Sequence, residues 1–322
     1  MRFVTFSWKA SRRPGMLLDD GRVLDLRLAL PIACSAGIMP PWQSPRLCED
    51  LTDFIALSDE LPALVGRLKE AARGSQFESA ILETGGFELV APIPYPRKNI
   101  FCVGRNYIDH VAEGDRTRNT SPQIPKVPQF FTKPATAVIA GGANVKWDPQ
   151  VTAELDYEVE LGVVIGKSGR DIAEKNALEH VFGYTIINDI SARDLQRAHG
   201  QWFKGKSLDG SCPMGPWIVH RDALKWVDDI AIALWVNGEL RQHARTSQLI
   251  FGLPRIIQEL SSGMTLHPGD IIATGTPAGV GFAMNPPQFL GDGDVVTCEI
   301  EGIGTLVNRI VRDDRRVRAK AS

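Results

Sequence analysis

Acidic side chains alternate along one stretch of the chain, at Glu154, Asp156, Glu158 and Glu160. In a strand, residues two apart lie on one face about 7 Å from each other, so a strand here would gather these carboxylates. Buried carboxylates that close repel one another, and a hard divalent cation that takes oxygen ligands relieves the repulsion. The alternative is an edge strand with an acidic, hydrated face. The apolar run at 161–165 favours a strand that carries its carboxylates into a cleft.

Another carboxylate, Asp189, follows the apolar stretch 184–187 and precedes a helical pattern. It could cap that helix, or it could supply a third carboxylate to a metal site. Arg193 and Gln196 are three residues apart on the same helix and therefore share a face. A cation and an amide beside a cleft suit an anionic substrate, and a solvated helix face is the alternative.

The pair His110 and Glu113 has the spacing of neighbours on one helical turn. A carboxylate that orients an imidazole is a common way to build a general base that deprotonates water. A surface ion pair is the alternative. Gly114 and the polar residues up to 119 predict a mobile segment, as a lid over a site requires.

Two glycine-containing segments add further candidates. Residues 200–207 fit the phosphate-loop pattern, but a helical stretch precedes them and no helix can start after them, so we reject that interpretation. Lys206 is then a single cation near the metal site or a surface lysine. The loop 274–281 lacks dinucleotide-binding spacing. Its amides and the Thr276 hydroxyl could bind a carboxylate, and a plain tight loop is the alternative.

The elements that must position these residues are mostly short strands. β-branched runs separated by glycine and proline turns predict strands at 99–103, 158–165, 185–188, 217–220, 232–236, 270–274 and 295–300. Helices are expected at 61–72, 171–181, 192–199 and 247–260. The fold class is therefore α+β, mostly β: a mixed β-roll or barrel with inserted helices. The proline-rich stretch 91–96 divides a small N-terminal α+β domain, 1–95, from a catalytic domain, 96–322.

Composition excludes several classes of partner. The chain of 322 residues has a net charge of −2, so it lacks the basic excess that attracts nucleic acid or anionic membranes. No apolar run is long enough to span a bilayer and no signal peptide is visible, so we expect a cytoplasmic protein. The five cysteines form no C-x-x-C pair, which favours reduced thiols.

Together these segments resemble the fumarylacetoacetate hydrolase superfamily over residues 99 to about 310. The resemblance is carried, in the family's order, by the segments 103–107, 157–161, 188–194, 205–207, 275–281 and 301–308. It implies a usually dimeric enzyme that binds Mg²⁺ or Mn²⁺, with Ca²⁺ as a substitute in a crystal. It assigns the metal to Glu158, Glu160 and Asp189.

The resemblance also implies roles for other residues. His110, Glu113 and Lys206 would be catalytic, with the first two on a lid. The substrate, a small 2-oxo acid, would be bound by a second group: Arg105, Tyr107, Arg193, Gln196 and Thr276.

From these roles we expect hydrolysis of an acylpyruvate, a fumarylpyruvate-like 2,4-dioxo acid. His110, oriented by Glu113, would deprotonate a water that attacks the distal carbonyl. The C–C bond would break because the metal and Lys206 stabilise the departing pyruvate enolate. One alternative is decarboxylation of a 2-oxo acid such as oxaloacetate, or isomerisation of a hydroxymuconate-like dioate. An alternative of another class is a catalytically silent ligand-binding protein on the same fold.

Overall fold

A large mixed sheet runs through the molecule in the computed structural model, which describes residues 1–39, 49–57, 61–117 and 120–313. Its main path has the strand order β4-β3-β2-β1-β14-β12-β11-β17-β6-β7, and β5 and β8 pair with β1 and β14. The strands are β1 Arg2–Trp8, β2 Ser11–Leu17, β3 Val23–Asp25, β4 Ile81–Leu82, β5 Glu88–Val90, β6 Ile100–Gly104, β7 Gln129–Lys133, β8 Val138–Ile139, β11 Val159–Ile165, β12 Val181–Asn188, β14 Cys212–His220 and β17 Ile271–Ala273.

A second, smaller sheet packs against the first. Its order is β16-β15-β18-β19-β9, and β11 contacts both β15 and β18. Apolar side chains from both sheets, among them Leu161, Val163, Leu234 and Val296, form one continuous buried cluster. The strands are β9 Asn144–Trp147, β15 Ala231–Val236, β16 Glu239–Arg245, β18 Val295–Ile300 and β19 Gly304–Arg312; a separate pair joins β10 Leu155–Asp156 to β13 Ser191–Ala192.

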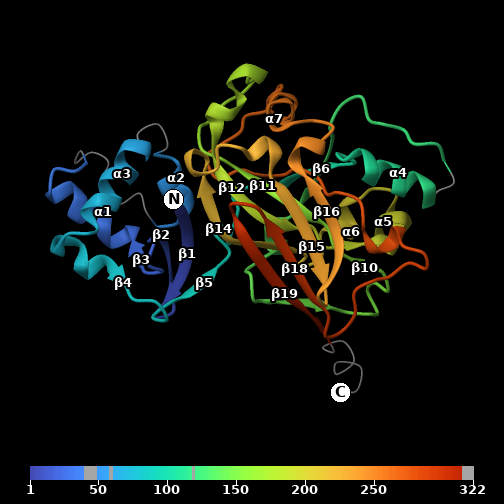
Figure 1. The fold of residues 1–322 in the computed structure, drawn as a ribbon, viewed down its shortest axis with the longest axis horizontal. Coiled ribbons are helices and arrows are strands. Elements are labelled where there is room, and N and C mark those ends of the chain that lie inside the picture. Colours follow the sequence, from blue (N-terminus) through green and yellow to red (C-terminus); the bar gives the residue numbers. More distant parts are fainter. Residues whose placement is uncertain (40–48, 58–60, 118–119, 314–322) are drawn as a thin grey trace.

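Helices cover the sheets at opposite ends of the molecule (Figure 1). At the N-terminal end lie α1 Leu26–Ser35, α2 Leu51–Ile55 and α3 Leu61–Ala71; towards the other end lie α4 Ile108–Thr117, α5 Arg193–His199 and α6 Phe203–Lys206, with α7 Leu253–Ser261 at the top of the view. Asp25 begins α1 because its side chain accepts a hydrogen bond from the Arg27 amide at 2.9 Å. No helix in the described ranges is long and apolar enough to cross a membrane.

The N-terminal segment shares its sheet and its core with the rest of the chain. Strand β1 pairs with β14, with Arg2 opposite Val219 and Phe3 opposite Ile218. Phe3 also belongs to a buried apolar cluster that extends to Ile271, far along the chain. The division into units 1–95 and 96–322 stays a prediction, and the sheet continues across it.

The expected mixed, strand-rich fold is confirmed, although the sheets do not close into a barrel. The strand expected at 158–165 is β11, but the alternating stretch 154–160 is not one continuous strand, because Tyr157 and Glu158 separate β10 from β11. The Asp156 carboxylate accepts hydrogen bonds from the amides of Tyr157 and Gly281, which turns the backbone away from a regular ladder. The helix expected at 171–181 is a 3₁₀ helix over Glu174–His180.

Candidate active site

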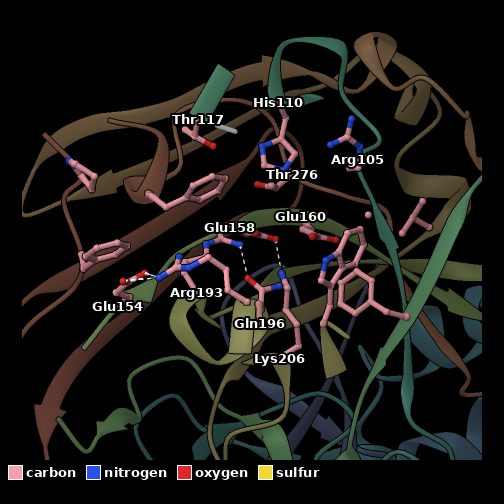
Figure 2. Close-up of a pocket in the computed structure, with 18 of the residues that line it drawn as sticks. Arg105, His110, Thr117, Glu154, Glu158, Glu160, Arg193, Gln196, Lys206 and Thr276 are labelled. Atoms are coloured by element: carbon pink, nitrogen blue, oxygen red, sulfur yellow. Dashed lines mark hydrogen bonds and ion pairs between the residues drawn. The ribbon is translucent and has the colours of Figure 1, made fainter. Parts of the chain in front are cut away.

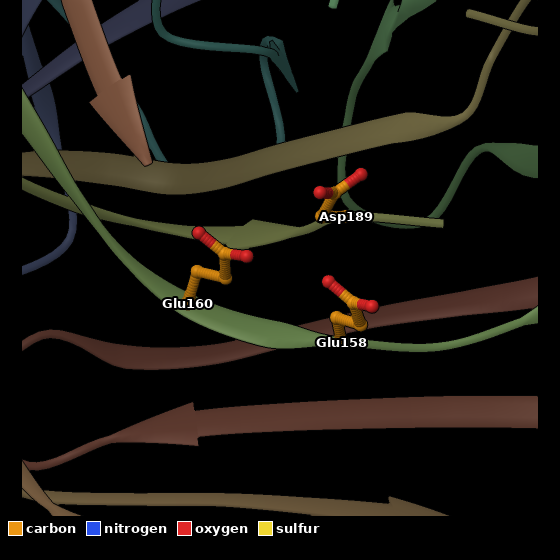
Figure 3. Close-up of side chains that lie close together, drawn as sticks. All are labelled: Glu158, Glu160 and Asp189. Atoms are coloured by element: carbon orange, nitrogen blue, oxygen red, sulfur yellow. The ribbon is translucent and has the colours of Figure 1, made fainter. Parts of the chain in front are cut away.

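Two antiparallel strands bring three carboxylates together. Strands β11 and β12 pair Val159 with Asn188, so Glu158 and Asp189 lie at the same end of the ladder. The Asp189 amide donates to the Glu158 carbonyl at 2.8 Å, and Glu160 lies on the same face two residues along β11. One oxygen from each carboxylate lies within 4.8 Å of the others (Figure 3). The carboxylates of Glu158, Glu160 and Asp189 therefore converge as the alternation and the strand end predict.

Cationic side chains surround this cluster. Lys206 Nζ lies 2.7 Å from Glu158 Oε2 and 2.7 Å from Asp189 Oδ2. Lys133, which is fully buried, lies with its Nζ 2.7 Å from Asp189 Oδ1. Arg193 Nη2 lies 2.7 Å from Glu158 Oε1. Asp189 does not cap α5, whose N-cap residue is Ala192 without a side-chain hydrogen bond.

Glu160 differs from its neighbours because it lacks a cationic partner among the described residues. Its Oε2 accepts a hydrogen bond from the Gly275 amide at 2.7 Å. Burial, and then the charges of Asp189 and Glu158, raise the pKa of Glu160 well above its usual range. For Glu158, burial works in the same direction but Lys206 and Arg193 outweigh it, which lowers the pKa to about 2.

The cluster fits a divalent cation. Three buried carboxylates offer the hard oxygen ligands that Mg²⁺ and Mn²⁺ prefer. A cation would also be the positively charged partner that Glu160 lacks among the described side chains. Burial opposes the charge on Lys206, but Asp189 and Glu158 raise its pKa, so it remains an ammonium group beside the cluster. The assignment of these side chains as metal ligands stays a prediction.

The expected histidine–carboxylate pair forms on α4. His110 Nδ1 lies 2.8 Å from Glu113 Oε1. Glu113 Oε2 accepts a second hydrogen bond, at 2.9 Å, from the amide of Gly279 in the glycine-rich loop. With Nδ1 bonded to the carboxylate as a donor, Nε2 is the ring nitrogen left to accept a proton.

Arg193, the first residue of α5, links the carboxylate cluster to the rest of that helix and to the opposite wall of the cavity. Its Nη1 donates to Gln196 Oε1 at 3.1 Å, as their spacing predicts, and its guanidinium lies over the Phe282 ring at 4.6 Å. Its Nε donates to Asp156 Oδ2 at 2.8 Å. The expectation that Asp156 shares a face with Glu158 and Glu160 is therefore corrected. The break in the strand turns it towards Arg193 and the amides of the glycine-rich loop.

These groups open into a cavity of about 610 Å³. Figure 2 shows His110 and Thr276 on one side of it, and Arg193, Gln196 and Lys206 on the other, with Glu158 and Glu160 between. The rest of the lining combines charged and polar residues with aromatic and small apolar ones: Val103, Gly104, Arg105, Thr117, Phe131, Glu154, Arg197, Gly200, Trp202, Phe282, Pro287 and Phe289.

Arg105 and Tyr107, both expected to bind the substrate, differ in their access to the cavity. Arg105 lines the cavity but forms a bidentate ion pair with Asp115, with both contacts at 2.8 Å. Tyr107 is buried and does not line the cavity, and its hydroxyl has no hydrogen-bond partner in the part of the chain that the structure describes. Its burial, together with the charge of Glu160, raises the pKa of that hydroxyl. A direct contact between Tyr107 and a ligand stays a prediction, and the present arrangement does not favour it.

Sequence reasoning misses Lys133 and Gln242. Lys133 ends β7 as one lysine among many, and no spacing connects it to Asp189. Gln242 lies on β16 of the other sheet and is fully buried; its side chain bonds both to β11 and to the loop that carries Thr276. The sequence shows only that a lysine and a glutamine stand at strand positions that face the core. That pattern does not reveal which groups these two side chains contact.

The chain is similar to known proteins in both sequence and fold. Residues 99–311 match the fumarylacetoacetate (FAA) hydrolase C-terminal family. The chain is 43% identical over 312 residues to an oxaloacetate tautomerase, YisK, of Bacillus subtilis, covering 96% of this chain and all of that protein. A fumarylacetoacetate hydrolase from Exiguobacterium antarcticum superposes with a TM-score of 0.76 at 37% identity, covering 97% of this chain and all of the other. A maleylpyruvate hydrolase from Sphingobium has a TM-score of 0.71 at 29% identity, with the same coverage.

Proposed function

Because the chain belongs to the fumarylacetoacetate hydrolase family, we propose that it is a divalent-metal-dependent tautomerase of a 2-oxo acid of the oxaloacetate class. The observation that carries the proposal is the placement of His110, held by Glu113, in the same cavity as the carboxylate cluster. Such an arrangement suits removal of a proton from a carbon beside a carbonyl. The full-length similarity to an oxaloacetate tautomerase supports the choice of substrate class.

Glu158, Glu160 and Asp189 would hold the metal ion, Mg²⁺ or Mn²⁺. When bound, the ion supplies Lewis-acid stabilisation of negative charge on the 2-oxo oxygen. Lys206 adds a second positive group beside the cluster, and two of its hydrogen-bond positions are taken by Glu158 and Asp189. Its third N–H is the one available to the substrate.

His110 would act as the base and then as the acid. Its Nε2 takes a proton from the carbon next to the keto group, and the electron pair of that C–H bond moves to form the enolate. Protonation of the enolate oxygen gives the enol, and the reverse sequence returns the ketone. Glu113 orients the ring and stabilises its protonated form, since its own position is secured by the Gly279 amide. Thr276, Gln196 and Arg193 would orient the substrate carboxylate.

Acylpyruvate hydrolysis is the second candidate, favoured by the same dyad and by the likeness to a maleylpyruvate hydrolase. In that reaction the base deprotonates a water, and the C–C bond breaks with the pyruvate enolate as leaving group. Decarboxylation of oxaloacetate also passes through an enolate, but it needs neither a nucleophilic water nor proton removal from carbon. A base at His110 is therefore required for tautomerisation and hydrolysis, and not for decarboxylation.

The test is a set of absorbance assays with oxaloacetate, acylpyruvates and hydroxymuconates, with Mg²⁺ or with EDTA. We expect loss of the enol absorbance of oxaloacetate to be accelerated with Mg²⁺ and not with EDTA. His110→Ala should reduce the rate by roughly 10²-fold or more. The matched control is His243→Ala, because His243 is exposed on β16 and outside the cavity lining. Full activity of the His110 variant would refute the proposed base, and turnover of acylpyruvates alone would replace tautomerisation by hydrolysis.

A wild-type protein that binds a 2-oxo acid but converts none of these compounds would support the catalytically silent alternative. Ligand-induced shifts in the melting midpoint provide that measurement. The homodimer expected from the resemblance is part of the same proposal, and the molar mass in solution tests it.

A further inference from the structure

Gln242 joins the strand of the carboxylate cluster to the loop on the opposite side of the cavity. Its side chain is fully buried on β16. The Oε1 atom accepts a hydrogen bond at 3.0 Å from the amide of Val159, the residue between Glu158 and Glu160. The Nε2 atom donates at 2.8 Å to Thr276 Oγ1 and at 2.7 Å to the Pro277 carbonyl. Each polar atom of the amide group therefore has a partner.

The orientation of this amide follows from its partners. The Val159 N–H can only donate, so the atom facing it must be the amide oxygen. The Pro277 carbonyl can only accept, so the atom facing it must be the amide nitrogen. The exchange of oxygen and nitrogen that is usually ambiguous for a glutamine is therefore excluded here. Gln242 must be the donor towards Thr276 Oγ1.

The direction of the Thr276 hydroxyl hydrogen follows in turn. Its oxygen accepts from Gln242, so its own hydrogen must point to another acceptor. Among the described residues, the hydroxyl accepts the bond from Gln242 and donates none to another protein group. Thr276 lines the cavity together with His110, Glu158 and Glu160 (Figure 2). The hydrogen is therefore left to face a ligand in the cavity.

The backbone next to Thr276 is also held in place. The preceding Gly275 donates its amide to Glu160 Oε2 at 2.7 Å, and its φ of +102° is one that favours glycine. A Cβ at that position would lie 3.0 Å from the Val103 carbonyl and 2.8 Å from the Asn106 Cβ, so the loop packs tightly there. The backbone beside Thr276 is therefore held by Glu160, and the direction of its hydroxyl is set by Gln242.

We propose that Gln242 is a positioning residue that holds the Thr276 hydroxyl as a hydrogen-bond donor towards an acceptor oxygen of the ligand. The proposal deepens the proposed function and rests on it for the ligand class, an anionic 2-oxo acid whose carboxylate or keto oxygen would occupy this place. Gln242 also has a second role, because the same side-chain amide fixes the backbone between Glu158 and Glu160. The Thr276 hydroxyl and the carboxylate cluster are then held at a constant separation before any ligand binds.

A double-mutant cycle separates these two effects. Gln242→Glu keeps the shape of the side chain and is titrated at alkaline pH, because burial raises the pKa of a carboxyl group. The ionised carboxylate then accepts the Thr276 hydrogen and withdraws it from the cavity. Thr276→Val removes the hydroxyl at nearly constant volume, and Thr276→Ser retains it as the conservative variant. The probe is oxalate, an anion with the oxygens of a 2-oxo acid. Its Kd is measured by isothermal titration calorimetry with saturating Mg²⁺.

We expect Gln242→Glu and Thr276→Val each to weaken oxalate binding roughly tenfold, the effect of losing one hydrogen bond to a charged group. Thr276→Ser should bind oxalate about as well as the wild type. In the Thr276→Val background, adding Gln242→Glu should change the Kd by about twofold or less, because the hydroxyl through which it acts is already absent.

Equal losses from Gln242→Glu in both backgrounds would overturn the proposal, since the residue would then act through Val159 alone. Unchanged oxalate binding by Thr276→Val would also overturn it. If Gln242→Glu does not fold, as judged by circular dichroism, Gln242→Met enters the same cycle with the same criteria. A wild type that binds oxalate without converting oxaloacetate would refute the proposed activity and leave the cycle decisive. A wild type that does not bind oxalate would overturn both.

Discussion

Replacing Lys133 by methionine should lower the free energy of unfolding by about 3 kcal/mol. Lys133 is fully buried, with its Nζ 2.7 Å from Asp189 Oδ1 and 3.0 Å from the Ile190 carbonyl. Removing one partner of a buried ion pair costs about 3–5 kcal/mol, because the other charge stays in a poorly solvated position. Asp189 keeps Lys206 at 2.7 Å, so we expect the lower end, about 3 kcal/mol.

The assay is urea unfolding followed by circular dichroism and by tryptophan fluorescence, in EDTA so that no divalent cation contributes. The matched control is Lys69→Met, because Lys69 forms an exposed pair with Asp19 at 2.9 Å. Exposed pairs contribute little, so this variant should unfold at the wild-type urea concentration. If Lys133→Met unfolds at the same urea concentration as Lys69→Met, the buried pair does not stabilise the fold and the reasoning is refuted.

Further predictions concern packing and pH. Gly66→Ala should raise the free energy of unfolding by about 0.5–1 kcal/mol, because Gly66 lies exposed within α3 with open space around a new Cβ; an unchanged or lower urea midpoint would contradict this. Gly104→Ala should weaken oxalate binding, because the new Cβ would lie 2.2 Å from Trp202 Cζ3 and displace a ring that lines the cavity. If the variant binds oxalate with the Kd of the wild type, measured by calorimetry, this prediction is wrong. The Mg²⁺-induced rise in melting midpoint should grow from pH 5.5 to pH 7.5, because the raised pKa of Glu160 makes protons compete with the cation; a shift that is constant or falls with pH would contradict that sign.

The alternation of carboxylates predicts much of the site from local sequence. Glu158 and Glu160 share a face because side chains on a strand repeat every two residues, and Asp189 joins them because β12 ends opposite the start of β11. The spacing of His110 and Glu113 likewise suffices to place them on one turn of α4. These features depend on period and register, which sequence patterns contain.

The remaining features depend on contacts between distant segments. Asp156 leaves the expected face because loop amides more than a hundred residues away compete for its oxygens. Lys133 and Gln242 reach the site from other strands, and no local pattern encodes those partners. The β1–β14 pairing, which carries the sheet across the expected domain boundary, is long-range for the same reason.

The most direct test of the account is the binding of Mn²⁺ to the EDTA-treated protein, followed by electron paramagnetic resonance. We predict a single Mn²⁺ per chain in the wild type, loss of that binding in Glu160→Gln and in Asp189→Asn, and retention in Glu299→Gln, an exposed glutamate on β18. The account is contradicted if Glu160→Gln and Asp189→Asn bind Mn²⁺ with wild-type affinity. It is also contradicted if the wild type binds no Mn²⁺.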